Sequence, residues 1–120
     1  MKEQIDEIKV FNDDEISVGK WFYGKPNLTP DKNGNISIIT KLSFGPLEVF
    51  EWGIDSKGKP YRMYLWLEND FFKTDNYVKE ITHSELKQQI ESMIQLSVSN
   101  NLSEWIPIYE QAIGMLEDNS

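Results

Sequence analysis

Hydrophobic and aromatic residues alternate with polar ones through the middle of the chain, at the two-residue period of a β-strand. The longest such stretch covers residues 47–70 and is interrupted by a polar turn around Gly58. It predicts two long strands joined as a hairpin. Because both faces of this hairpin carry apolar or aromatic residues, it belongs at the centre of a sheet, with something packed on each face or with one face kept for a partner.

Three further stretches have the composition of strands. The segment ISVGKWFYG (residues 16–24) predicts one strand before the hairpin, and the β-branched segment ISIITKLSF (residues 36–44) predicts another. Asn33 and Gly34 predict a turn ahead of the second segment, because both residues tolerate positive φ. After the hairpin, YVKEI (residues 77–81) predicts a short fifth strand or an extended lead-in.

The hydrophobic period changes to that of an α-helix after residue 81. Thr82 and Glu85 have the spacing of a capping box, in which each side chain accepts a hydrogen bond from the other residue's backbone. The first helix has an apolar stripe formed by Leu86, Ile90, Met93, Ile94 and Val98. A second helix, beginning between residues 103 and 107, has a stripe formed by Trp105, Tyr109, Ala112, Ile113 and Leu116. Residues 1–11 are compatible with a short helix or an added edge strand, and we expect a short helix there.

The order of these elements, strands first and helices last, predicts the fold class. Short connections between strands favour antiparallel pairing, and neither half of the chain can bury its apolar face alone. The sequence therefore predicts an α+β fold, with an antiparallel sheet of four to five strands and two C-terminal helices packed on one face. A length of 120 residues fits a single domain, 1–120.

The chain contains no cysteine, which excludes disulfides, thiolate metal sites and a thiol nucleophile. Its first residues carry charges where a secretory signal needs an apolar segment, and no run of about 18 apolar residues predicts a transmembrane helix. A reducing cytoplasm is the simplest location for such a protein, and no membrane association is expected.

The formal charge of −8 is unevenly distributed along the chain. Residues 61–120 hold ten acidic residues against four basic ones, and no basic residue follows Lys87. A negative field of this kind repels phosphate backbones, so binding to nucleic acid is not expected. Two interpretations stay open: the charge serves solubility, or it steers a basic partner towards the protein.

The ionisable residues do not predict an enzyme. His83 is the only histidine, and no serine or cysteine motif accompanies it. The positions of Glu48 and Glu51 on a strand differ by an odd number, so the two side chains point to opposite faces, whereas a glycosidase needs converging carboxylates. No catalytic residue and no cofactor is therefore predicted.

One segment resembles the start of a calcium-binding loop. Asp31, Asn33 and Asn35 have the alternating spacing of the first ligands, but Gly34 comes before the third ligand instead of after it, and the twelfth position is Leu42 instead of a glutamate. We interpret the segment as a turn and predict no metal site.

The remaining candidate chemistry is that of a protein interface. Exposed Trp and Tyr beside acidic residues are typical of such surfaces. The predicted anchors are the strand aromatics Trp52, Tyr64 and Trp66, and the predicted acidic contacts are Glu68, Asp70, Glu104, Glu110, Glu117 and Asp118. Whether the aromatic strand residues belong to the core or to an interface is left open by the pattern.

With its small size, its acidic second half and the aromatic strands WFY (residues 21–23) and YLWLEND (residues 64–70), the chain resembles an immunity protein of a bacterial polymorphic toxin system, such as contact-dependent growth inhibition. The resemblance implies a cytoplasmic antitoxin that binds one toxin domain, often a basic nuclease, and blocks its active site or substrate surface. The alternative is a non-catalytic adaptor or small subunit of a bacterial or phage protein assembly.

Overall fold

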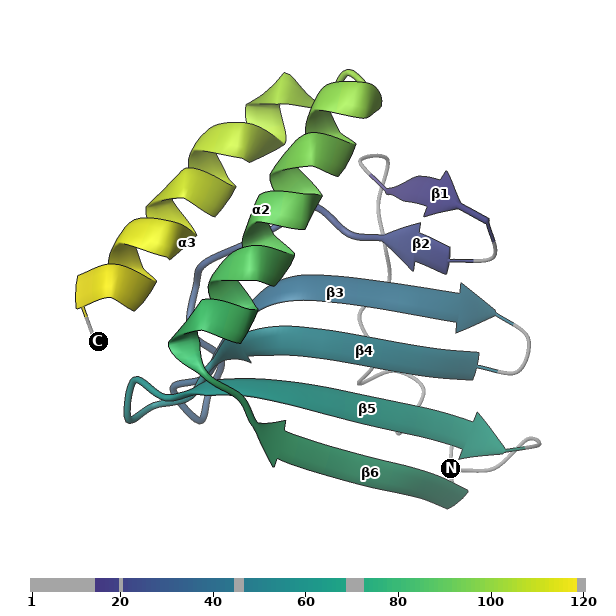
Figure 1. Cartoon of the computed structure of the whole chain (residues 1–120). Helices are drawn as coiled ribbons and strands as arrows, with labels where there is room; N and C mark the ends of the chain where they lie inside the picture. The colour runs from purple at the N-terminus through teal and green to yellow at the C-terminus, as the bar shows by residue number, and fades with distance from the viewer. Residues whose placement is uncertain (1–14, 20, 45–46, 69–72, 119–120) are drawn as a thin grey trace.

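The computed structural model describes residues 15–19, 21–44, 47–68 and 73–118, and all structural statements refer to them. The short helix expected within residues 1–11 lies outside this range. The described residues form a six-stranded antiparallel sheet and two C-terminal helices that pack on one face of it (Figure 1). The strands are β1 (Ile16–Val18), β2 (Trp21–Tyr23), β3 (Ile36–Phe44), β4 (Leu47–Ile54), β5 (Pro60–Glu68) and β6 (Lys73–Glu80). They are followed by α2 (His83–Ser99), the 3-10 turn η1 (Ser103–Trp105) and α3 (Ile106–Asp118).

The expected α+β class is confirmed, but the sheet has more strands than the four to five expected. Residues 16–24 do not form one strand, because the chain turns at Gly19 and β1 pairs antiparallel with β2. Gly19 has a φ of 62°, a backbone conformation that glycine adopts without steric cost. At the other edge, β6 begins at Lys73, four residues before the predicted start. Each strand pairs with its neighbours in the chain, so the sheet is a simple meander.

The core lies between the helices and the sheet. The strands contribute Ile38, Ile39, Trp52 and Ile54, and the helical segment contributes Leu86, Ile90, Met93, Trp105, Tyr109, Ala112 and Leu116. Both predicted helix stripes are therefore largely confirmed, with one error. Val98 is 57% exposed, because twelve steps of about 100° place it roughly 120° around the helix from Leu86. Ser97 takes the inward position, and its hydroxyl donates to the Met93 carbonyl oxygen at 2.8 Å.

The capping box at the start of α2 is confirmed. The Glu85 amide donates to the Thr82 hydroxyl at 3.0 Å, and the Thr82 amide donates to a Glu85 carboxylate oxygen at 3.0 Å. These hydrogen bonds, first of all the one from the Thr82 backbone, hold the pKa of Glu85 below its ordinary value. Two amides that the helix cannot satisfy internally thus find side-chain acceptors.

We expect Thr82→Ala to lower the free energy of unfolding by about 0.5–2 kcal/mol, because the Glu85 amide loses its acceptor. Urea melts measure the change, with Ser84→Ala, two residues further on, as the control expected to stay within about 0.5 kcal/mol of wild type. Folding lowers the pKa of Glu85, so the ionised carboxylate stabilises the folded state. This stabilisation is fully present above the carboxyl pKa of the unfolded chain and is lost as the pH falls through the carboxyl pKa of the folded protein. A Thr82→Ala penalty close to zero at neutral pH would contradict this assignment.

The segment that resembles a calcium loop is a turn closed on itself. One carboxylate oxygen of Asp31 accepts from the backbone amides of Asn33 and Asn35, at 2.8 and 3.0 Å. Gly34 supplies the positive φ, 85°, that the turn requires. Within the described residues, no group of three or more potential ligands could hold a metal ion.

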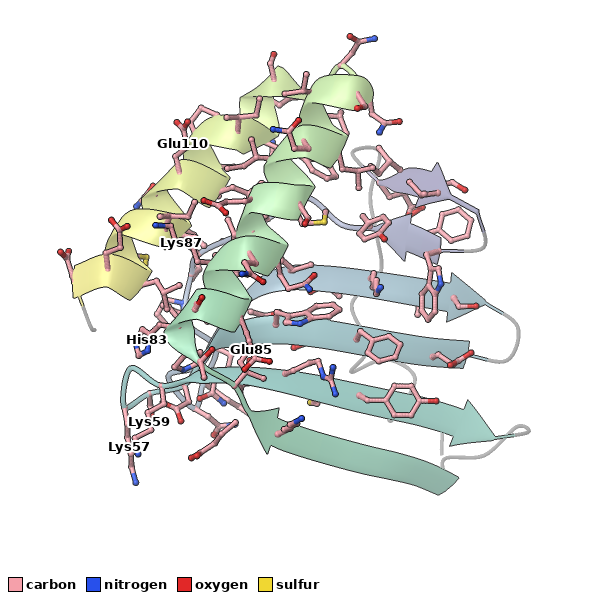
Figure 2. All side chains as sticks on the ribbon, in the orientation of Figure 1. Lys57, Lys59, His83, Glu85, Lys87 and Glu110 are labelled. Carbon is pink, nitrogen blue, oxygen red and sulfur yellow. The ribbon has the colours of Figure 1, made fainter. Side chains whose placement is uncertain are left out.

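The connection between β4 and β5 repeats this arrangement. One carboxylate oxygen of Asp55 accepts from the amides of Lys57 and Lys59, both at 2.9 Å, and Gly58 has a φ of 83°. The two turns are joined by a hydrogen bond from the Ser56 amide to the Asn35 side-chain oxygen, at 3.1 Å. Lys57 and Lys59 point away from the rest of the molecule at this end of the sheet (Figure 2).

Candidate binding surface on the sheet

The two helices cover only part of the sheet face on which they pack. Helix α2 begins directly after β6 and crosses the end of the sheet where β4 finishes and β5 starts (Figure 1). The opposite ends of β3, β4 and β5 extend beyond both helices. Side chains on this face are therefore core residues at one end of a strand and surface residues at the other.

Beyond the helices this face carries five residues that we call the open sheet surface: Trp21, Lys41, Glu48, Phe50 and Tyr64. The strand register places Lys41, Phe50 and Tyr64 side by side on β3, β4 and β5. Measured between ring centroids, the Phe50 ring lies 5.4 Å from the Trp21 ring and 4.7 Å from the Tyr64 ring. All five side chains are partly exposed, so the rings form a continuous aromatic surface.

Lys41 lies beside Phe50, where the open sheet surface meets the core residue Trp52. Its ammonium nitrogen is 5.1, 5.4 and 5.2 Å from the ring centroids of Trp21, Phe50 and Trp52, which is within the range of cation–π attraction. Partial burial among these rings lowers the pKa of Lys41. No carboxylate of the described residues lies within ion-pair distance of it.

Glu48 is the acidic member of the open sheet surface. The Tyr64 hydroxyl donates to its Oε1 atom at 3.2 Å, which fixes the tyrosine ring beside Phe50. Glu48 pairs with Ser43 and Trp66 across the strands, two residues further along each strand than the Lys41–Phe50 pair. The two charged groups thus lie on the same face without forming an ion pair.

The three predicted anchors have different positions. Trp52 is only 8% exposed and belongs to the core cluster beneath the helices, with its ring stacked 6.0 Å from that of Phe50. Tyr64 belongs to the open sheet surface. The side chain of Trp66 lies outside the described part of the structure, as do the side chain of Glu68 and the whole of Asp70.

The other predicted acids lie on the helical layer. Glu104 is on η1, and Glu110, Glu117 and Asp118 are on α3, all of them exposed. Glu110 points away from the sheet (Figure 2). Glu117 forms an ion pair with Lys87 of α2 at 3.1 Å, and both side chains remain largely exposed. The structure therefore separates the predicted site into an acidic helical layer and an aromatic sheet surface.

Sequence reasoning missed Lys41 as a member of the site. The signal that could have found it is the turn pair Gly45 and Pro46, which separates the predicted strand 36–44 from the predicted hairpin. Residues equally distant from such a turn face each other, and Lys41 and Phe50 are equally distant from it. The position of the turn alone therefore predicts that Lys41 pairs with Phe50 across the two strands.

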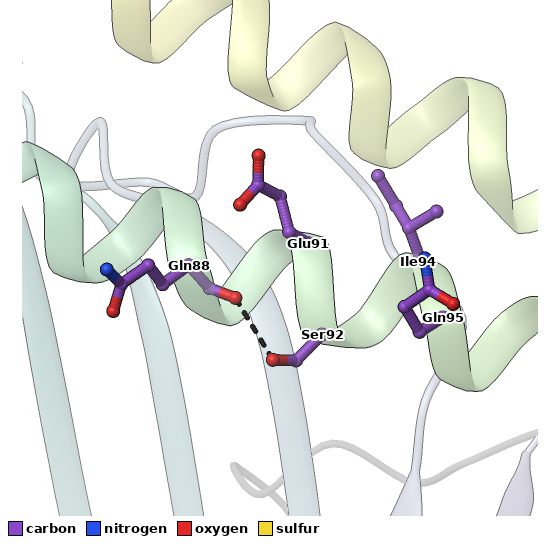
Figure 3. A pocket seen from close by; sticks show the side chains of 5 residues that line it. All are labelled: Gln88, Glu91, Ser92, Ile94 and Gln95. Carbon is purple, nitrogen blue, oxygen red and sulfur yellow. Dashed lines mark hydrogen bonds between the residues drawn. The ribbon is translucent and has the colours of Figure 1, made fainter.

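A hollow of about 520 Å³ lies on the outer side of α2 and is lined by Gln88, Glu91, Ser92, Ile94 and Gln95 (Figure 3). The Ser92 hydroxyl donates to the Gln88 carbonyl oxygen at 3.1 Å, and Glu91 is the one ionisable residue of the lining. His83 stands at the first residue of α2, with its Nε2 atom buried and without a hydrogen-bond partner in the described structure. The lining of the hollow therefore places no histidine beside Ser92. That the protein has no catalytic site stays a prediction.

Among the helices that the structure describes, none combines the length and the apolar character that crossing a membrane requires. Comparison with known proteins gives no relative from which a function could be transferred. No family model, no curated protein and no solved structure matches this chain.

Proposed function

We propose that this protein is a cytoplasmic immunity protein that binds a cognate toxin domain and neutralises it. The observation that carries the proposal is the charge of the helical layer. Residues 83–118 expose six carboxylates against the single lysine Lys87, which is already paired with Glu117. Such a layer attracts a basic protein surface and repels the phosphates of nucleic acid.

The partner that fits this layer is a basic, nuclease-type toxin domain. A nuclease carries positive charge where it binds its substrate, so an acidic protein that occupies this surface excludes the nucleic acid. The open sheet surface supplies what charge alone does not, because partly exposed aromatic rings are the usual anchors of a protein interface. The same two surfaces would also serve an adaptor or small subunit of a larger assembly, which binds without inhibiting.

Co-purification from the native host is the first test. We expect the protein to retain one basic partner in a fixed ratio, and the partner's enzymatic activity to fall when the complex forms. An adaptor would retain a partner whose activity is unchanged. Recovery of an acidic partner alone, or of none under conditions in which the protein is folded, would contradict the proposal.

Surface plasmon resonance across a salt series tests the role of the helical layer in that complex. We expect the association rate of wild type to fall as salt rises, since the screening length at physiological ionic strength is about 8 Å. The double variant Glu104→Lys/Glu110→Lys should associate more slowly, with a smaller effect on the dissociation rate. Glu80→Lys, an exposed acid on β6, is the control for charge change elsewhere. If the association rate changes neither with salt nor in the double variant, these acids serve solubility and do not steer the partner.

A further inference from the structure

We propose that the open sheet surface receives a carboxylate side chain of the bound partner, which pairs with the Lys41 ammonium. The inference rests on the proposed function, because it presumes a protein partner, and it names the chemical group that the partner brings to a surface separate from the acidic helical layer. The partner is then expected to have a basic surface that includes one acidic side chain, positioned to meet Lys41.

The first argument is the state of Lys41 in the free protein. Its ammonium lies among three aromatic rings and has lost part of its hydration, as its lowered pKa also indicates. Aromatic rings offset some of this loss but do not supply a counter-charge. A carboxylate that approaches here would meet a cation in a medium of lower dielectric than water, where opposite charges attract more strongly.

The second argument is the arrangement of the other charged group on this face. Glu48 does not pair with Lys41; one of its oxygen atoms accepts from Tyr64 instead. A carboxylate placed beside Glu48 would be repelled, whereas one held at the Lys41 ammonium lies beside the rings of Trp21 and Phe50. The aromatic rings there can pack against the aliphatic part of an Asp or Glu side chain.

The third argument is that the net charge of the protein alone predicts a preference for basic groups and not for a carboxylate. With a formal charge of −8, the chain as a whole repels acidic groups. A half-buried lysine among aromatic rings therefore selects for one carboxylate within a partner that is otherwise basic. Charge reversal at Lys41 separates this inference from simple electrostatic steering, since the two predict changes of opposite sign.

The test uses the complex obtained by co-purification and the variants Lys41→Glu and Lys57→Glu. Both variants add the same negative charge, but Lys57 lies on the exposed turn between β4 and β5. If only steering operated, both would bind a basic partner as tightly as wild type or more tightly. We expect Lys41→Glu to weaken binding by roughly 30-fold or more, mainly through faster dissociation, and Lys57→Glu to bind at least as tightly as wild type. Equal behaviour of the two variants would overturn the inference and leave the proposed function intact.

A second variant guards against loss of folding. Lys41→Met keeps an unbranched apolar side chain over the rings and removes only the charge. We expect its thermal melt to remain cooperative and its binding to weaken as well. If Lys41→Met folds and binds as wild type does, the carboxylate contact does not exist.

A measurement on the free protein tests the inference without the partner. The protein is labelled with ¹³C at the lysine Cε atoms, and its NMR spectrum is followed while N-acetyl-glutamate methylamide is added; the neutral glutamine analogue is the control probe. We expect the Lys41 signal, assigned with Lys41→Met, to shift with the glutamate probe more than the Lys57 signal does, and neither to shift with the glutamine probe. Equal shifts of Lys41 and Lys57 would overturn the inference, even if no partner is recovered and the proposed function itself has failed.

Discussion

Ile90→Ala is expected to lower the free energy of unfolding by about 2–5 kcal/mol. Ile90 lies in the middle of α2, is fully buried, and belongs to the cluster that joins the helices to the sheet. Its truncation removes apolar contacts and leaves a cavity that close-packed neighbours fill only in part. Urea melts followed by circular dichroism measure the loss through the midpoint at an unchanged slope.

Val98→Ala is the matched control on the same helix. The hydrophobic period of the sequence places Ile90 and Val98 on one stripe, whereas the structure buries the first and leaves the second 57% exposed. We therefore expect Val98→Ala to stay within about 0.5 kcal/mol of wild type. Similar losses for the two variants would mean that α2 is rotated relative to the sheet.

The second large effect is expected from Gly53→Ala. Gly53 lies on β4 where the pairing with β3 shifts between Ser37 and Ile39. A Cβ atom on Gly53 would collide with the carbonyl oxygen of Ile36 and lie 2.9 Å from the Tyr61 hydroxyl oxygen. Backbone atoms cannot move aside as a flexible side chain can, so the strands would have to separate. We expect a loss of about 3 kcal/mol or more in the free energy of unfolding.

Gly114→Ala is the contrasting variant. A Cβ atom at Gly114 of α3 meets no other atom within 4 Å. Alanine is the better helix former by about 0.5–1 kcal/mol, so this change should stabilise the protein. Thermal melts of the two variants are expected to move in opposite directions, and a stable Gly53→Ala would show that the strands are not as close at this point as described.

The sequence predicted those elements whose signals are local. The bounds of β3 were right because ISIITKLSF is a continuous β-branched run between turn residues. The start of α2 was right because the capping box is a pattern of only four residues, beginning at Thr82. The class of the fold followed from the order of such elements.

Other features depended on contacts that the sequence does not encode locally. Gly19 stood in a segment of high strand propensity, and its turn became evident only through the pairing of β1 with β2. Trp52 could be assigned to the core only once α2 was known to cover its end of β4. The open sheet surface exists because the helices cross only one end of the sheet face, which is a property of the packed structure and not of any single segment.

The meander order of the sheet has a consequence for how fast the protein can fold. Every strand is paired with its neighbour in the chain, and the two helices also follow each other directly. The entropy lost in closing a loop is small when the partners are close in sequence, and chains rich in such contacts cross their folding barrier quickly. The twin turns that begin at Asp31 and Asp55 hold their own shape through side-chain hydrogen bonds, so the chain reversal between β4 and β5 can form before the core is assembled. A newly synthesised chain of this topology can reach its native state without waiting for distant segments to meet.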